Sequence, residues 1–231
     1  MSVNGFVHII ESPSPSDLLD GRTEGRALGE ALRLAGIPYS YNLAADRTTF
    51  VAALGARLSE AWKIHQKLLI LHFSMHGNQD GVQLTTGEFL SWYDLRQDLL
   101  PLLRAMQGGL LICLSSCSGG SGCRMAMYED AEIPFWALVG NTVDTEWSNA
   151  AVAYITFYHL LFKGKDVASC VEAMKVASGD SNFMVFSGQH ARDSWINFQR
   201  QQRTQAIGSA LQNLGLGAPV PGSAAPGSGL L

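Results

Sequence analysis

Two side chains that together could break an amide bond each follow a short apolar run. Residues 109–114 form one run, and it leads through Ser115 and Ser116 into Cys117 and a pair of glycines. Residues 67–71 begin a second run of the same design, which ends at His76 and Gly77. A cysteine thiol becomes a strong nucleophile as the thiolate, and a nearby imidazole can take its proton. The pair therefore predicts nucleophilic catalysis by Cys117 with His76 as its acid/base partner.

Backbone donors beside these two residues could complete such a site. Gly77 has no side chain, so a substrate backbone can come close and the local N–H groups stay free to point inward. Together with the N–H of Cys117 they would form an oxyanion hole, where each donor contributes about 3 kcal/mol to acyl transfer. We therefore expect Gly77 and Cys117 to supply the oxyanion hole.

A metal site competes for the same residues. His72 and His76 stand four apart, as do Cys113 and Cys117, and Cys123 follows soon after. Nitrogen and sulfur ligands of this kind suit zinc. However, His72 and Cys113 fall inside apolar runs, where a core position is expected, and paired C-x-x-C knuckles are absent from the sequence. Zinc remains an alternative, and we assign no metal and no other cofactor.

Two further interpretations have less support. Ser121 lies in a glycine-rich stretch that does not complete the G-x-S-x-G elbow of serine hydrolases. Cys117 could also be a buried structural thiol, because most free cysteines are buried in this way. The serines and glycines around it make a poor apolar pocket, which favours a functional thiol.

Predicted strands and helices alternate along the chain, and they must position His76 and Cys117. Apolar runs bounded by turn residues predict strands over 6–10, 37–43, 135–140 and 182–187. The two runs that lead to His76 and Cys117 are predicted strands as well. Helical spacing predicts helices over 18–35, 48–62, 91–106, 150–162, 167–178 and 191–206, with a small hairpin over 78–90. Alternation of this kind is typical of a layered α/β domain with a mainly parallel sheet. Because parallel strands carry their carboxyl ends on one edge, His76 and Cys117 should meet there.

Composition narrows the function classes. The chain has 231 residues, of which 47% are hydrophobic and 16% charged, with a formal net charge of −4. The lack of a basic patch argues against nucleic acid as a partner. We find no signal-peptide pattern and no run long enough for a membrane span, and expect no membrane partner. The four cysteines do not resemble a disulfide framework, so we expect reduced thiols and a cytoplasmic location.

One domain should occupy residues 1–207. Residues 208–231 are rich in Gly, Pro, Ser and Ala. This composition predicts a disordered tail.

At these motifs the sequence resembles the caspase-like cysteine peptidases, which include caspases, metacaspases and, most similar, the bacterial CHAT group. The shared pattern is an apolar strand into His76-Gly77 and a later apolar strand into Cys117, and residues 140–144 and 157–165 also look like the CHAT pattern. The resemblance implies a caspase-like three-layer α/β/α sandwich with a mainly parallel central sheet of about six strands. It also implies a Cys117 nucleophile, His76 as general acid/base, and an extended peptide held as an added strand.

The sequence departs from the family at one position. Caspases carry Gln and metacaspases Asp two residues before the cysteine, and this chain has Ser115. Asp144 and Glu146 follow the next strand, where the family builds part of its S1 wall, and they could favour a basic P1 residue or simply be solvated acids. We expect Trp147 near the substrate. The predicted substrate-binding residues are Ser115, Ser116, Asp144, Glu146 and Trp147.

The sequence thus predicts a cysteine endopeptidase that cleaves a protein substrate through a thioester acyl-enzyme. A role in bacterial cell death or anti-phage defence is an expectation by analogy. The first alternative is a catalytically silent binding module of the same fold, and the second, with less support, is a zinc-binding protein. We expect activity without obligatory cleavage of the chain, although Arg124 offers a site for nicking. Whether the protein is a monomer or a dimer stays open.

Overall fold

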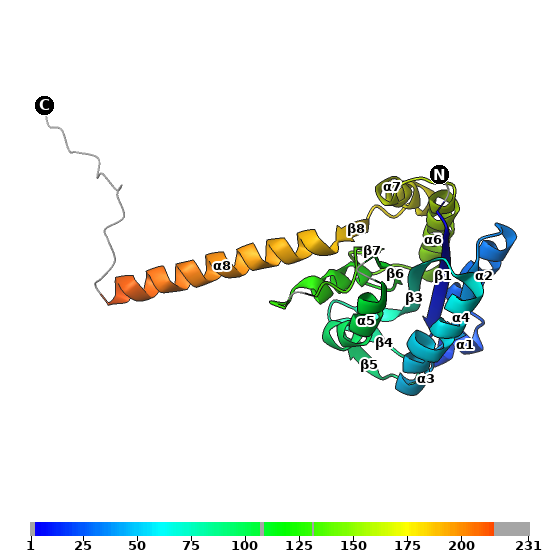
Figure 1. Cartoon of the computed structure of the whole chain (residues 1–231), viewed down its shortest axis with the longest axis horizontal. Helices are drawn as coiled ribbons and strands as arrows, with labels where there is room; N and C mark the ends of the chain where they lie inside the picture. Colours follow the sequence, from blue (N-terminus) through cyan, green and yellow to red (C-terminus); the bar gives the residue numbers. More distant parts are fainter. Residues whose placement is uncertain (1–2, 107–108, 131, 215–231) are drawn as a thin grey trace, which may run out of the picture. The chain divides into compact units, whose positions relative to one another are not determined.

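The computed structural model describes residues 3–106, 109–130 and 132–214, and Figure 1 shows it. The chain divides into two compact units, Met1–Arg192 and Asp193–Leu231. The first unit contains the sheet and both predicted catalytic residues. Within the described residues, no helix combines the length and the apolar character that crossing a membrane requires.

The first unit is built on a sheet with the strand order β2-β1-β3-β6-β7-β8. The strands are β1 (Gly5–Ser12), β2 (Tyr39–Leu43), β3 (Leu68–Asn78), β6 (Leu111–Ser115), β7 (Ala137–Asn141) and β8 (Phe183–Ser187). All neighbours pair in parallel except β8, which runs antiparallel to β7. At the end of β3, the short strands β4 (Gly81–Gln83) and β5 (Phe89–Ser91) add an antiparallel hairpin. The predicted mainly parallel sheet of about six strands is confirmed.

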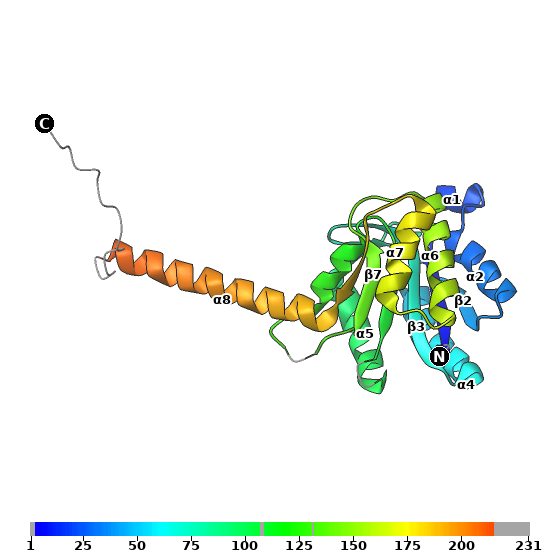
Figure 2. The ribbon, with the colours of Figure 1, turned by 90° about the horizontal axis from the view of Figure 1, so that it is seen from above.

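Helices cover both faces of this sheet, as Figures 1 and 2 show. One face carries α2 (Glu24–Leu34), α6 (Trp147–Phe162) and α7 (Val167–Ser178). The other carries α3 (Arg47–Ala52), the π-helical turn η1 (Ala53–Arg57), α4 (Leu58–His65) and α5 (Trp92–Met106). These three layers are the predicted α/β/α sandwich.

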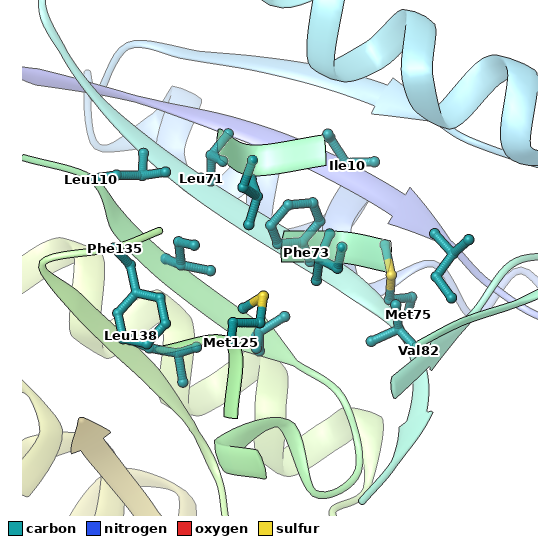
Figure 3. Packing of buried hydrophobic residues seen from close by; sticks show 14 of the residues in the cluster. Ile10, Leu71, Phe73, Met75, Val82, Leu110, Met125, Phe135 and Leu138 are labelled. Carbon is teal, nitrogen blue, oxygen red and sulfur yellow. The ribbon is translucent and has the colours of Figure 1, made fainter. Parts of the chain in front are cut away.

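Alternate residues of the central strand enter two separate cores. Leu71, Phe73 and Met75 of β3 pack with the residues shown in Figure 3, on the side of α3, α4 and α5. Ile70 lies in the core beneath α2 and α6. Successive side chains of a strand point to opposite faces, so an apolar strand such as β3 supplies both cores at once.

The helix predicted over 18–35 is in fact two helices. Helix α1 (Pro15–Leu19) begins earlier, and α2 follows after a turn. Gly21 in that turn has φ +69°, a left-handed conformation that interrupts a helix and that glycine adopts without strain. Because of this interruption α1 is a separate short helix after β1, and it carries Asp17, which contacts His76.

Two later segments also differ from expectation. The connection after Cys117 contains a 3₁₀ helix, η2 (Gly119–Ala126), where an open loop was predicted. The buried Arg96 of α5 ties this connection down, since its Nε donates to the Met125 carbonyl at 3.0 Å. The last helix, α8 (Gly188–Asn213), is longer than the predicted 191–206 and includes the first residues of the expected tail. The remainder of that tail, from 215 onward, lies outside the described residues.

Candidate active site

Sheet register places the two predicted catalytic residues side by side. Ser74 of β3 lies opposite Ser115 of β6 in a parallel pair. His76 and Cys117 each come two residues later, so both lie just beyond the last paired residues of β3 and β6, where β3 goes on to pair with β4. They line one cavity of about 70 Å³. The structure therefore brings together the two residues that the sequence singled out.

The absence of a side chain at Gly77 permits the close approach of these two segments. A Cβ at this position would lie 3.2 Å from the Cys117 carbonyl oxygen, 3.2 Å from the Ser116 Cβ and 3.0 Å from the Gly81 carbonyl oxygen. Such separations are tighter than ordinary van der Waals contacts, so any larger residue would push the His76 and Cys117 segments apart.

His76 is held on two sides. Its Nε2 forms a hydrogen bond with Asp17 Oδ2 at 2.6 Å. Its ring meets the Trp147 ring edge to face, with centroids 5.2 Å apart. Because Asp17 engages Nε2, the nitrogen left to exchange a proton with a thiol is Nδ1.

Asp17 is a site residue that the sequence reasoning missed. Its backbone and carboxylate complete a capping box with Ser14 at the start of α1, and it is buried. Burial acts to raise the pKa of Asp17, but hydrogen bonds from Ser14 and His76 and the charge of His76 outweigh it and lower the pKa. The carboxylate thus remains ionised at neutral pH and can orient the imidazole.

A sequence signal for Asp17 does exist. Ser14 and Asp17 have the S-x-x-D spacing of a capping box, directly after the carboxyl end of β1. In the sheet β1 lies next to β3, with Ser12 opposite Met75. Acids that follow a neighbouring parallel strand are therefore candidates for any site at this edge.

The chain turns sharply directly after Cys117. Ser118 has φ +52°, in the left-handed region that non-glycine residues avoid. Its N–H donates to the Val143 carbonyl at 2.9 Å. The Cys117 Sγ donates to the Thr145 carbonyl at 3.7 Å. The loop after β7 thus fixes both the turn and the resting position of the thiol.

That loop is anchored by Asp180. Its carboxylate accepts hydrogen bonds from Asn141 Nδ2 at 2.6 Å, from Thr145 Oγ1 at 3.3 Å and from the Asn182 backbone N–H at 2.9 Å. Partial burial acts to raise the pKa of Asp180, and these hydrogen bonds outweigh that effect and lower it. One carboxylate therefore connects the loop after β7 to the segment before β8.

The predicted substrate-binding residues fall into two groups. Ser115, Ser116 and Trp147 line the cavity together with His76 and Cys117. Asp144 and Glu146 are exposed and do not belong to the cavity lining. A part for these two acids in substrate binding stays a prediction, as does the oxyanion hole of Gly77 and Cys117.

The fold divides the residues considered for zinc into two pairs, because His72 lies opposite Cys113 inside the sheet while His76 and Cys117 line the cavity at its edge. His72 is fully buried and hydrogen-bonded through Nδ1 to the Tyr158 hydroxyl at 3.0 Å. Burial raises the pKa of the Cys113 thiol to about 12, which disfavours the thiolate that a metal needs. Among the residues that the structure describes, no three His, Cys, Asp or Glu side chains are grouped to hold a metal ion.

Comparisons with known proteins come from structure alone. No protein-family model matches the sequence, and no curated protein matches it. A secreted C11 cysteine protease from Bacteroides thetaiotaomicron, called iotapain, aligns with a TM-score of 0.56 at 10% identity, over 83% of this chain and 68% of that one. This likeness confirms the predicted caspase-like α/β/α fold.

Two structures of gingipain R are also similar. One is the complex of pro- and mature domains of RgpB from Porphyromonas gingivalis, and the other is the Arg-specific cysteine proteinase gingipain R (RGPB). Both have TM-scores of 0.49, at 11% and 12% identity, over 80% of this chain. The chain spans about half the length of these two, covering 47% and 46% of them.

Proposed function

We propose that the protein is a cysteine endopeptidase in which Cys117 is the nucleophile and His76 the general acid/base. The observation that carries this proposal is the shared cavity, which both side chains line at the carboxyl ends of adjacent parallel strands. The caspase-like fold supports it, because the solved structures with a similar fold include a cysteine protease. Asp17 enters the proposal as the residue that positions His76.

The proposed reaction uses these groups in order. His76 Nδ1 accepts the Cys117 proton, and the thiolate attacks the carbonyl carbon of the scissile bond. The oxyanion that forms is stabilised by the N–H groups of Gly77 and Cys117. His76 then gives its proton to the leaving amine, which breaks the C–N bond and leaves a thioester on Cys117. A water molecule, deprotonated by His76, hydrolyses the thioester and regenerates the thiol.

The protein substrate is proposed to bind as an extended peptide. Trp147 stands against the His76 ring and lines the cavity, where it can contact that peptide. The two exposed acids, Asp144 and Glu146, can reach a basic side chain only from outside this cavity.

The first experiment measures thiol reactivity. Iodoacetamide labelling followed by mass mapping should modify Cys117 readily in the wild type and much more slowly in His76→Ala, because the imidazole no longer takes the thiol proton. His159→Ala, which changes an exposed histidine of α6 outside the cavity, is the matched control and should label as the wild type does. Equal labelling of Cys117 in all three proteins would contradict the dyad.

The second experiment measures peptide-bond cleavage. Wild-type protein and Cys117→Ala are incubated with a proteome-derived peptide mixture, and new N-termini are identified by mass spectrometry. Cleavages that need Cys117, and whose rate falls about 10²–10⁴-fold in His76→Ala, are expected. Retained thiol reactivity with no Cys117-dependent cleavage would favour the catalytically silent binding module instead.

Three finer attributes belong to the same proposal. The order of the His76-Gly77 and Cys117 motifs supports a CHAT-type peptidase, and the small number of cysteines supports a cytoplasmic location. A role in bacterial cell death or phage defence rests on analogy with other proteases of this fold. Phage plaque counts on cells that carry the wild type or Cys117→Ala test that role, with more plaques expected for the variant.

A further inference from the structure

The cavity beside Cys117 is small and has an uncharged floor. Its volume of about 70 Å³ is roughly half of the ~150 Å³ that admits benzene in a protein interior. It is lined by Met75, His76, Ser115, Ser116, Cys117, Thr145, Trp147 and Ala150. No carboxylate, guanidinium or ammonium group is among them. A long charged or aromatic side chain therefore lacks the room to enter this cavity, and a basic side chain would also find no carboxylate in the lining.

Two hydroxyl groups of the lining have no hydrogen-bond partner. Ser115 and Ser116 are 1% and 2% exposed, and the Oγ of each is buried without a partner in the part of the chain that the structure describes. Buried hydroxyls are satisfied in the large majority of native proteins. A pair that remains unsatisfied in a cavity beside a nucleophile is therefore suited to a polar group brought by a ligand.

The sheet and α6 explain why the wall of the cavity beside these buried hydroxyls is built of small side chains. Ser115 ends β6 opposite Ser74 of β3, so two small polar side chains lie next to each other at this end of the sheet. Above them, α6 contributes Ala150, whose methyl group does not fill the space, while Trp147 one turn earlier closes the side next to His76. The pocket is thus narrowed on one side by Trp147, and it is polar because β6 leads into two serines.

We infer, resting on the endopeptidase function proposed above, that this cavity receives the P1 side chain and selects substrates with serine or threonine there. The scissile carbonyl carbon becomes attached to Cys117 Sγ, so the side chain that enters an adjoining cavity is the one on the same residue as that carbonyl. A short side chain fits the volume, and its hydroxyl forms hydrogen bonds with the Ser115 and Ser116 hydroxyls.

The test uses quenched fluorescent peptides that differ only at P1. Threonine and valine have the same shape, as serine and alanine nearly do, so each pair isolates the hydroxyl group. We expect kcat/KM for Thr to exceed that for Val by about tenfold or more, and arginine, aspartate and phenylalanine to be cleaved at least 100-fold more slowly than Thr.

Variants assign the selectivity to the two serines. In the double variant Ser115→Ala with Ser116→Ala, the Thr-to-Val ratio should fall to about one, because the partners of the substrate hydroxyl are gone. Ser121→Ala is the matched control: this serine lies in η2 outside the cavity lining, and its removal should leave the Thr-to-Val ratio as in the wild type.

The possible outcomes distinguish a failure of the P1 inference from a failure of the proposed endopeptidase function. Cleavage that prefers arginine or lysine, as Asp144 and Glu146 would produce, or that treats Thr and Val alike, overturns the P1 inference and leaves the peptidase standing. A Thr-to-Val ratio that survives loss of both serines also overturns it. If no peptide is cleaved and Cys117 reacts equally with and without His76, the peptidase function itself fails and the P1 inference with it.

Discussion

At the scale of single residues, the candidate site is a chain of contacts that begins at Asp17. Its carboxylate meets His76 Nε2, and His76 lines the cavity with Cys117. The lowered pKa of Asp17 means that its stabilising contribution is present at neutral and mildly acidic pH and is lost as the pH falls through the lowered value. The His76 contact therefore persists over the pH range in which an imidazole exchanges protons.

Replacing Asp17 should impair the chemical step. Asp17→Asn keeps the size of the side chain but removes the charge that stabilises the imidazolium, so kcat should fall about 10- to 100-fold with little change in KM. Steady-state kinetics with a cleaved peptide measures both constants.

Two variants separate positioning from helix capping. Ser14→Ala removes the partner of Asp17 in the capping box, costs about 1 kcal/mol of stability and should leave kcat much closer to that of the wild type. Asp20→Asn changes an exposed acid of the same segment and should leave both constants unchanged. A kcat of Asp17→Asn no lower than that of Ser14→Ala would show that Asp17 acts only through α1.

At the scale of elements, the loop between β7 and α6 decides where the thiol rests. The Val143 carbonyl holds the turn at Ser118, the Thr145 carbonyl accepts from Cys117, and Asp180 holds the loop from the other side. Gly140 at the end of β7 is equally constrained, because a Cβ there would lie 2.7 Å from the backbone of Gly119. The position of Cys117 thus depends on backbone packing as much as on its own strand.

Loss of Asp180 should lower both the stability of the protein and its activity. In Asp180→Ala the loop loses its shared acceptor, so we expect about 1–2 kcal/mol lower stability and a clear drop in kcat/KM at temperatures where the protein is folded. Urea unfolding and peptide cleavage measure the two effects.

Asp166→Ala provides the comparison for this prediction. Asp166 caps α7 through Ser169, and its loss should lower stability without changing kcat/KM. An equal fall in activity for both variants would indicate that general destabilisation, and not the position of the loop, is responsible.

At the scale of the whole first unit, a buried histidine makes folding sensitive to acid. His8 of β1 is fully buried, with Nε2 3.0 Å from the Ala53 carbonyl in the π-helical turn and Nδ1 2.6 Å from Ser40 Oγ. Burial lowers the pKa of His8 to about 4, and the hydrogen bond to Ala53 opposes that shift only in part. Unfolded chains bind this proton near pH 6.5, so stability falls as the pH drops below that value and continues to fall until about pH 4.

The expected loss from His8 between pH 7 and pH 5 is about 2 kcal/mol. Urea unfolding of the wild type at both pH values should show it, and His8→Gln, although less stable at pH 7, should show a pH dependence smaller by that amount. His159→Gln, an exposed control, should keep the full dependence. A pH dependence that is unchanged in His8→Gln would contradict the assignment.

The sequence alone predicted the sheet, its parallel core, and the pairing of His76 with Cys117. These features depend on local apolar runs and on the rule that parallel strands end together, both of which act along the chain. It also placed Ser115, Ser116 and Trp147 near that pair. The break between α1 and α2 was missed because the helix was extended back from the apolar spacing of Leu28, Leu32 and Ala35 across Gly21, whose left-handed conformation interrupts it.

Only the tertiary structure decided which groups surround the dyad. Asp17 reaches His76 because β1 lies beside β3 and α1 turns over its end, and Asp144 and Glu146 lie outside the cavity because the loop after β7 turns them toward solvent. Contacts of this kind join segments that are far apart in the sequence, so no local pattern encodes them. The two candidate catalytic residues could be predicted from the strands that precede them, whereas the partner of His76 and the size of the pocket arise only when the layers pack together.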